Sequence, residues 1–147
     1  MIKIIIVDDS STSRITLEKL ILKNFSDNYE IVSICEDANS AKKAIKSNKP
    51  DLVFLDIEMP NKNGFELLKE IKSINFEVIF TTSHTDYAIK AIKADALDYL
   101  IKPINLKELN IALRRFENKR IVKDNTDTKV IIAKTGNELI KKIAFST

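Results

Sequence analysis

The sequence has little of several residue types on which other classes of protein depend. Its 147 residues include one cysteine, Cys35, so the chain can form neither an internal disulfide nor a cysteine-based metal cluster. We expect Cys35 to be a small buried strand residue in a protein of a reducing compartment. The only two glycines, Gly64 and Gly136, lie far apart. The phosphate-binding loops G-x-G-x-x-G and G-x-x-x-x-G-K-[ST] are therefore absent, which excludes the nucleotide-binding domains built on them.

Long apolar runs are also missing. No run approaches the roughly 18 to 20 residues that span a bilayer, and the N-terminal MIKIIIVDDS becomes acidic too early for a secretory signal. We therefore expect a cytoplasmic protein that does not bind membranes. A hydrophobic fraction of 44% with 31% charged residues is typical of a globular chain that buries a sizeable core.

The net charge of +3 is spread unevenly. Residues 1–104 contain 14 Lys and Arg against 16 Asp and Glu, whereas residues 105–147 contain 10 against 5. A basic tail can bind nucleic acid, but this one has no interleaved aromatic residues and no recognisable recognition helix. A solvated basic face is the alternative, and charge alone does not decide between the two.

Short apolar segments alternate with stretches of helical periodicity. The apolar segments are rich in β-branched residues and cover residues 4–7, 31–34, 52–55, 78–80 and 97–101. Helical spacing of apolar residues follows each of them, as in residues 15–25 and 106–116. Helix-start signals are found at Ser10 or Ser11, at Asp37 or Asn39, and at Asn105 followed by Glu108. Strand and helix repeated five times predict an α/β fold: a parallel sheet of strands buried on both faces, with helices covering each face.

The pattern fades after Arg120, which divides the chain into a domain over residues 1–120 and a tail. Residues 121–129 are polar and are interpreted as a linker. Residues 130–143 have the pattern of two strands joined by a turn. A lone hairpin is only marginally stable, so residues 130–147 are interpreted as the incomplete start of a second unit.

Acidic residues follow two of the predicted strands. Asp8 and Asp9 come after the first strand, and Asp56 comes after the third. Ligands of an open parallel sheet bind at the carboxyl ends of its strands, so these three carboxylates are expected to converge. Like charges that close repel one another unless a divalent cation joins them, and Mg²⁺ suits one or two carboxylates plus a phosphate. Taken alone, Asp8 and Asp9 can instead be a helix N-terminal pair favoured by the helix dipole.

A hydroxyl and a cation follow the last two strands. Thr82 can hydrogen-bond a phosphoryl oxygen, and Lys102 can offset its charge. Taken alone, Thr82 can be a strand-end residue that satisfies a backbone group, and Lys102 a surface lysine in the turn before Pro103. Together with the three aspartates, they predict phosphoryl transfer to an aspartate nucleophile.

Four motifs resemble the receiver domain of two-component response regulators. They are Ile5-Ile6-Val7-Asp8-Asp9, Leu55-Asp56-Ile57-Glu58-Met59-Pro60 followed by Gly64, Thr82-Ser83, and Tyr99-Leu100-Ile101-Lys102-Pro103. The resemblance covers residues 2 to about 118. It implies a flavodoxin-like, doubly wound sheet of five parallel strands in the order 2-1-3-4-5. It also implies that Asp56 is the phosphoacceptor and that a sensor histidine kinase is the donor.

The resemblance assigns a role to each site residue. Asp9, Asp56 and the backbone carbonyl of Glu58 are implied ligands of Mg²⁺, for which Mn²⁺ can substitute, while Asp8 acts mainly through bound water. Thr82 and Lys102 are implied to contact the phosphoryl group. The chain is then a phosphoacceptor that catalyses its own phosphorylation and dephosphorylation, and not an enzyme that turns over an external substrate.

The implied switch lies beyond the acceptor. The Lys102–Pro103 peptide bond is expected to be cis. Phosphorylation is expected to draw in Thr82 and turn Tyr99 inward, which biases a surface of the fourth helix, fifth strand and fifth helix toward a homodimer. Tyr99 is alternatively a core aromatic residue. The small Ser83 is expected to leave the site open to the donor.

Three further features involve residues outside these roles. Glu58 and His84 lie two residues beyond Asp56 and Thr82, where this family tunes dephosphorylation. His84 is expected to be a loop residue, because a metal site would need further ligands and the chain has no second histidine. The donor is expected to dock beside the first helix, where the candidate contacts are Arg14, Leu17 and Leu20, which can equally be core and surface residues.

Within the family, residues 78–92 and 96–100 are similar to the LytTR-type transcription regulators. Residues 130–143 resemble the opening strands of the LytTR DNA-binding domain, which has about 100 residues in full, a usual domain size. We therefore expect the chain to be part of a longer regulator and to bind DNA only through the rest of that output domain.

Other readings remain open. A phosphatase of the haloacid-dehalogenase kind also uses a strand-end aspartate, but its Asp-x-Asp signature is missing, and Asp56-Ile57-Glu58 follows the third strand, not the first. A phosphate-independent interaction module with the receiver fold is the main alternative, and the complete set of acceptor residues argues against it. The tail argues against a stand-alone relay domain.

Overall fold

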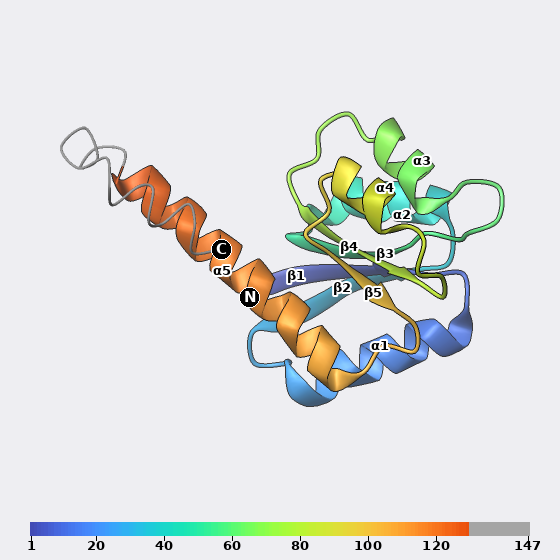
Figure 1. Cartoon of the computed structure of the whole chain (residues 1–147), viewed down its shortest axis with the longest axis horizontal. Helices are drawn as coiled ribbons and strands as arrows, with labels where there is room; N and C mark the ends of the chain where they lie inside the picture. The colour runs from blue at the N-terminus through green and yellow to red at the C-terminus, as the bar shows by residue number, and fades with distance from the viewer. Residues whose placement is uncertain (130–147) are drawn as a thin grey trace. The chain divides into compact units, whose positions relative to one another are not determined.

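The computed structural model describes residues 1–129 and contains all five predicted strands and helices in the predicted order. The strands are β1 (Ile2–Val7), β2 (Tyr29–Cys35), β3 (Leu52–Asp56), β4 (Glu77–Thr82) and β5 (Asp98–Ile101). The helices are α1 (Ser11–Asn24), α2 (Ala38–Asn48), α3 (Gly64–Glu70), α4 (Ala88–Lys93) and α5 (Leu106–Lys129). The strands form one parallel sheet in the order β2-β1-β3-β4-β5 (Figure 1), so the predicted doubly wound topology is confirmed.

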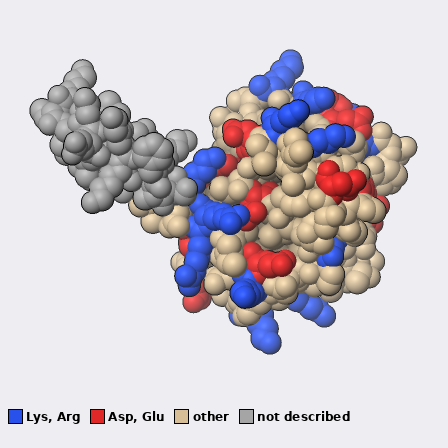
Figure 2. All heavy atoms as spheres, viewed as in Figure 1, with Lys and Arg blue, Asp and Glu red and all other residues tan. Residues whose placement is uncertain are grey.

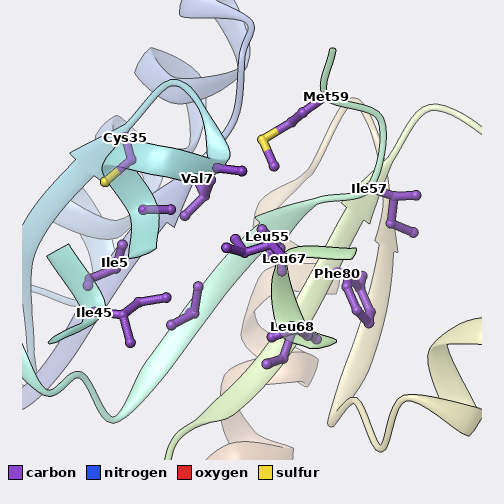
Figure 3. Packing of buried hydrophobic residues seen from close by; sticks show 14 of the residues in the cluster. Ile5, Val7, Cys35, Ile45, Leu55, Ile57, Met59, Leu67, Leu68 and Phe80 are labelled. Carbon is purple, nitrogen blue, oxygen red and sulfur yellow. The ribbon is translucent and has the colours of Figure 1, made fainter. Parts of the chain in front are cut away.

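The core lies on both faces of the sheet because side chains alternate along each strand. One face of β1, β3 and β4 packs with α2, α3 and α4 in a buried cluster that includes Ile5, Leu55, Leu67 and Phe80 (Figure 3). Helix α1 covers the opposite face (Figure 1). The central strands are buried as predicted, but β2 and β5 are only partly buried. The prediction of full burial was wrong for these two, because an edge strand has one neighbour instead of two.

Side-chain caps mark the starts of the helices and decide the alternatives left open by the sequence. Ser10 caps α1 and Asp37 caps α2, each accepting a backbone hydrogen bond from three residues on. The backbone hydrogen bond from that residue of α2 holds the pKa of Asp37 below its usual value. Asn105 accepts the corresponding bond at the start of α5, 2.9 Å long. Helix α3 begins with an unpredicted capping box formed by Asn63 and Glu66.

The chain divides into two compact units, residues 1–109 and residues 110–147, and α5 begins in the first unit. The backbone of residues 121–129, the segment interpreted as a linker, is helical. This polar stretch contains no glycine or proline, so no residue in it interrupts the helix that precedes it. The hairpin and LytTR-like start predicted for residues 130–147 lie outside the described residues. Among those described, no helix is apolar enough over a sufficient length to cross a bilayer.

Candidate functional site

The three aspartates singled out by sequence meet at the carboxyl end of the sheet. Asp8 and Asp9 follow β1, and Asp56 is the last residue of β3. One carboxylate oxygen from each lies within 4.8 Å of the others. Asp8 and Asp56 are buried, at 4% and 2% exposure, while Asp9 is exposed. An all-oxygen donor set of this kind fits a hard divalent cation such as Mg²⁺.

Local backbone groups hold two of these carboxylates. The N–H of Ser10 donates to Asp8 Oδ1 at 2.9 Å, and the N–H of Glu58 donates to Asp56 Oδ1 at 3.3 Å. Arg14, which sequence analysis placed at the donor-docking face, donates through Nη1 to the backbone carbonyl of Asp8 at 2.8 Å. The main chain of the acidic site is therefore supported by the first helix as well as by its own strands.

Lys102 is the cation of the site. Its Nζ lies 2.8 Å from Asp8 Oδ2 and 3.3 Å from Asp56 Oδ1, with its side chain 16% exposed. Burial alone would lower the pKa of Lys102, but the hydrogen bond and charge of Asp8 and the charge of Asp56 outweigh it and raise that pKa. Lys102 therefore stays cationic between the two buried carboxylates. The peptide bond that joins it to Pro103 is cis.

One lysine does not neutralise three carboxylates. Burial, then the charge of Asp8 and a hydrogen bond with Asp9, raise the pKa of Asp56 from 3.8 to about 7, against the opposing charge of Lys102. The ionised cluster is thus electrostatically unfavourable as it stands, and a bound divalent cation would relieve it. This is the physical reason for regarding the cluster as a metal site.

Gly64 allows the loop after β3 to fold back onto the acceptor. A Cβ atom at this position would lie 2.7 Å from the backbone oxygen of Asp56 and 3.1 Å from the side chain of Leu55. The Gly64 N–H also donates to the carbonyl of Ile57 at 3.0 Å. In the sequence, Gly64 stands out only as part of a motif, since a close approach between backbones leaves no periodic signal.

Thr82, at the end of β4, is fully buried and contacts the side chain of Glu58. Its hydroxyl donates to Glu58 Oε1 and accepts the N–H of His84 at 3.1 Å. The other carboxylate oxygen of Glu58 lies 3.0 Å from Nε2 of His84. The Tyr99 hydroxyl donates to the backbone carbonyl of His84. The structure therefore brings together four residues that sequence analysis had placed separately, and the Glu58 side chain is the member whose contacts were missed.

A cavity of about 300 Å³ opens beside the acidic cluster. Its lining includes Asp8, Lys102, Ser83 and Thr12, so the cavity leads from solvent to Asp8 and Lys102. Leu17 also lines it but is only 4% exposed. Of the two alternatives for Leu17, the structure favours the core position, because the side chain is buried beneath α1.

Comparisons with known proteins agree with this geometry. The chain is 35% identical over 131 residues to the sensory transduction protein LytT of Bacillus subtilis, covering 88% of this chain and 53% of that protein. It is 38% identical to the transcriptional regulatory protein BtsR of Escherichia coli, covering 99% of this chain and 65% of that protein. The chain thus spans about half to two thirds of the length of these relatives.

The fold comparison points the same way. A solved DNA-binding response regulator of the LuxR family from Staphylococcus aureus superposes with a TM-score of 0.71 at 31% identity, covering 79% of this chain and 98% of that one. The family model of the response regulator receiver domain matches residues 4–114, which include every motif at the ends of the strands. The chain therefore belongs to the response regulator receiver domain family of two-component systems.

Proposed function

We propose that this chain accepts a phosphoryl group on Asp56, in a Mg²⁺-dependent reaction, from the phosphohistidine of a sensor histidine kinase. The observation that carries the proposal is the placement of Asp56. It lies at the end of a central strand, buried beside two further carboxylates and Lys102. Two of these neighbours, Asp8 and Lys102, line a cavity that opens to solvent. Membership of the receiver family supports a partner kinase.

The chemistry follows from these positions. A carboxylate oxygen of Asp56 attacks the phosphorus of the donor, and the bond from phosphorus to the donor's imidazole nitrogen breaks. Its electron pair leaves with the ring, which takes up a proton. Lys102 offsets the charge on the phosphoryl oxygens, and the Thr82 hydroxyl donates to one of them. The product is an aspartyl phosphate on this chain, so no external substrate is turned over.

The residues that would hold Mg²⁺ are Asp9, Asp56 and the backbone carbonyl of Glu58, with Asp8 acting through water. When bound, the ion supplies positive charge to the carboxylates and to the phosphoryl oxygens. Asp56 must be ionised to attack. Burial and the neighbouring carboxylates oppose that ionisation, and the added positive charge favours it.

The phosphoryl group is proposed to act on a second surface and, through it, on an output domain. Helix α4 exposes Ile89 and Ile92, at 69% and 75%, which can bury apolar area in a homodimer. The receiver family adds β5 and α5 to this surface. The relatives LytT and BtsR support a signalling and transcriptional output. On the face seen in Figure 2, Lys and Arg are interspersed with Asp and Glu, so DNA contact is assigned to the output domain and not to these residues.

The test is phosphorylation by acetyl phosphate, followed by intact mass with and without Mg²⁺. We expect a gain of one phosphoryl mass only with Mg²⁺, and no gain in Asp56→Asn. Asp51→Asn is the matched control, because Asp51 precedes β3 and lies outside the acidic cluster. No gain in a folded wild-type chain would overturn the proposal and favour a phosphate-independent interaction module.

A further inference from the structure

The hydroxyl of Thr82 is already occupied. It accepts the N–H of His84 at 3.1 Å and donates its hydrogen to Glu58 Oε1. A hydroxyl carries one hydrogen. Thr82 therefore cannot donate to a phosphoryl oxygen and to Glu58 at the same time, so the Glu58 contact has to break when Thr82 turns to the phosphoryl group.

The same carboxylate also holds the loop between β4 and α4. Glu58 Oε2 lies 3.0 Å from Nε2 of His84, and the Glu58 side chain is 32% exposed. His84 in turn accepts the Tyr99 hydroxyl on its backbone carbonyl, and the Tyr99 oxygen accepts the N–H of Tyr87 at 3.3 Å. These bonds form a continuous path from Glu58, beside the acceptor, to Tyr99 on β5.

Packing supports the rigidity of this path. The ring of Tyr87 lies 6.2 Å from Phe65 of α3 and 6.3 Å from His84, both by centroid. Phe65 packs against Phe80 of β4 with centroids 4.7 Å apart. A loop anchored at this many points moves as one body, so a change at Glu58 reaches Tyr99.

We propose that the Glu58 side chain is a positioning group. It keeps the Thr82 hydroxyl hydrogen-bonded to Glu58 Oε1 until a phosphoryl group competes for the single hydrogen of that hydroxyl. Loss of the Glu58–Thr82 bond then loosens His84 and, through its carbonyl, Tyr99. This inference rests on the proposed function for its phosphorylation arm. It assigns to Glu58 a role in the unphosphorylated state, separate from the lifetime of the aspartyl phosphate.

The first test needs no phosphate. Hydrogen exchange of the His84 and Tyr87 amides is followed by NMR in the unphosphorylated chain. Glu58→Ala is expected to speed exchange of both amides by about fivefold to tenfold, the equivalent of one ordinary net hydrogen bond. Glu30→Ala, which removes the same charge from an exposed site on β2, is the control and should leave both unchanged. Unchanged exchange in Glu58→Ala would overturn the path to Tyr99.

The second test separates positioning from charge. Removing any carboxylate near the site weakens the repulsion of an anionic donor, so a faster reaction of Glu58→Ala would not by itself show positioning. The initial rate of phosphorylation by acetyl phosphate at saturating Mg²⁺ is therefore measured in a double-mutant cycle of Glu58 and Thr82. We expect Glu58→Ala to raise this rate about threefold to tenfold in the wild type and in Thr82→Ser, which keeps the hydroxyl. In Thr82→Ala the gain should disappear. If the gain persists in a folded Thr82→Ala chain, the loss of the Glu58 negative charge alone explains the faster phosphorylation, and the proposal is overturned.

The two proposals fail differently. If the wild-type chain takes up no phosphoryl group, the proposed function fails, while the exchange test still decides whether Glu58 holds the loop. If the chain is phosphorylated but the cycle shows no coupling between Glu58 and Thr82, the function stands and the positioning role is wrong.

Discussion

The site has two halves that are built by different kinds of contact. The acidic half, Asp8, Asp9 and Asp56, is held by backbone N–H groups two residues along the chain and by Lys102. The switch half, Glu58, Thr82, His84 and Tyr99, is held mainly by side-chain contacts between residues far apart in the sequence, with one local bond from the His84 N–H to Thr82. Repulsion between like charges dominates the first half and mutual hydrogen bonding the second. Chemistry at the acidic half can therefore change without unfolding, while the switch half responds as a unit.

The largest effect is expected where a single charge stabilises the acidic half. Lys102→Met keeps most of the side-chain length but removes the cation that pairs with the carboxylates of both Asp8 and Asp56. We expect phosphorylation by acetyl phosphate to slow by about 100-fold, the usual cost of losing one group that stabilises the transition state. Lys46→Met on α2 removes an exposed lysine as the control. A loss below threefold would mean that Lys102 is structural only.

A smaller effect is expected from the backbone of the acidic half. Gly64→Ala would place a methyl group 2.7 Å from the Asp56 carbonyl oxygen, so the loop after β3 has to move. We expect a loss of about 2 kcal/mol in the free energy of unfolding, typical of overpacking, together with weaker Mg²⁺ binding. Urea denaturation and Mg²⁺ titration check both. Unchanged stability would mean that the loop yields freely and does not position the acceptor.

The acidic half also predicts a pH dependence. In EDTA, burial and the charge of Asp8 raise the pKa of Asp56 from 3.8 to about 7. The folded chain therefore binds this proton more tightly than the unfolded chain, and its stability is greatest at low pH within that window. The free energy of unfolding should fall by about 1 to 2 kcal/mol between roughly pH 4 and 7, less than the full shift implies because relaxation and water penetration reduce the cost of burying the charge.

Asp56→Asn tests this origin, since it removes the titrating group. The slope between pH 4 and 7 should disappear, and the variant should be more stable than the wild type at pH 8 in EDTA. Saturating Mg²⁺ should raise the free energy of unfolding of the wild-type chain at pH 8, because the ion binds the folded chain. An equal slope in both proteins would show that other groups cause it.

The contrast between the halves also explains what sequence alone could predict. Apolar runs such as residues 52–55 define buried strands, and strand order in a parallel sheet places Asp8 and Asp56 at the same edge. The sequence therefore predicts which residue types lie at the ends of the strands and that they meet at one edge of the sheet. The bond from Glu58 to Thr82 is not, because it depends on how the loop after β3 folds, and the close approach at Gly64 that shapes this loop has no periodic signal.

The burial of the two edge strands and the length of α5 were also predicted wrongly from the sequence. Apolar residues in β2 and β5 predicted full burial, yet edge position leaves both strands partly exposed. Polar composition made residues 121–129 resemble a linker, although composition does not stop a helix unless glycine or proline interrupts it. Both cases depend on neighbours that a local window of sequence does not contain.

The smallest effect is expected from the switch half, at Tyr99. Tyr99→Phe removes only the hydroxyl that donates to the His84 carbonyl and accepts from the Tyr87 N–H. We expect a loss of about 1 kcal/mol in stability, the low end of the net value of two hydrogen bonds, and faster exchange of the Tyr87 amide. Mg²⁺ affinity should stay within twofold of the wild type, because Tyr99 contacts no residue of the acidic half in the described hydrogen bonds. A tenfold change in Mg²⁺ affinity would mean that the two halves are one coupled unit, and that the separation drawn between them is wrong.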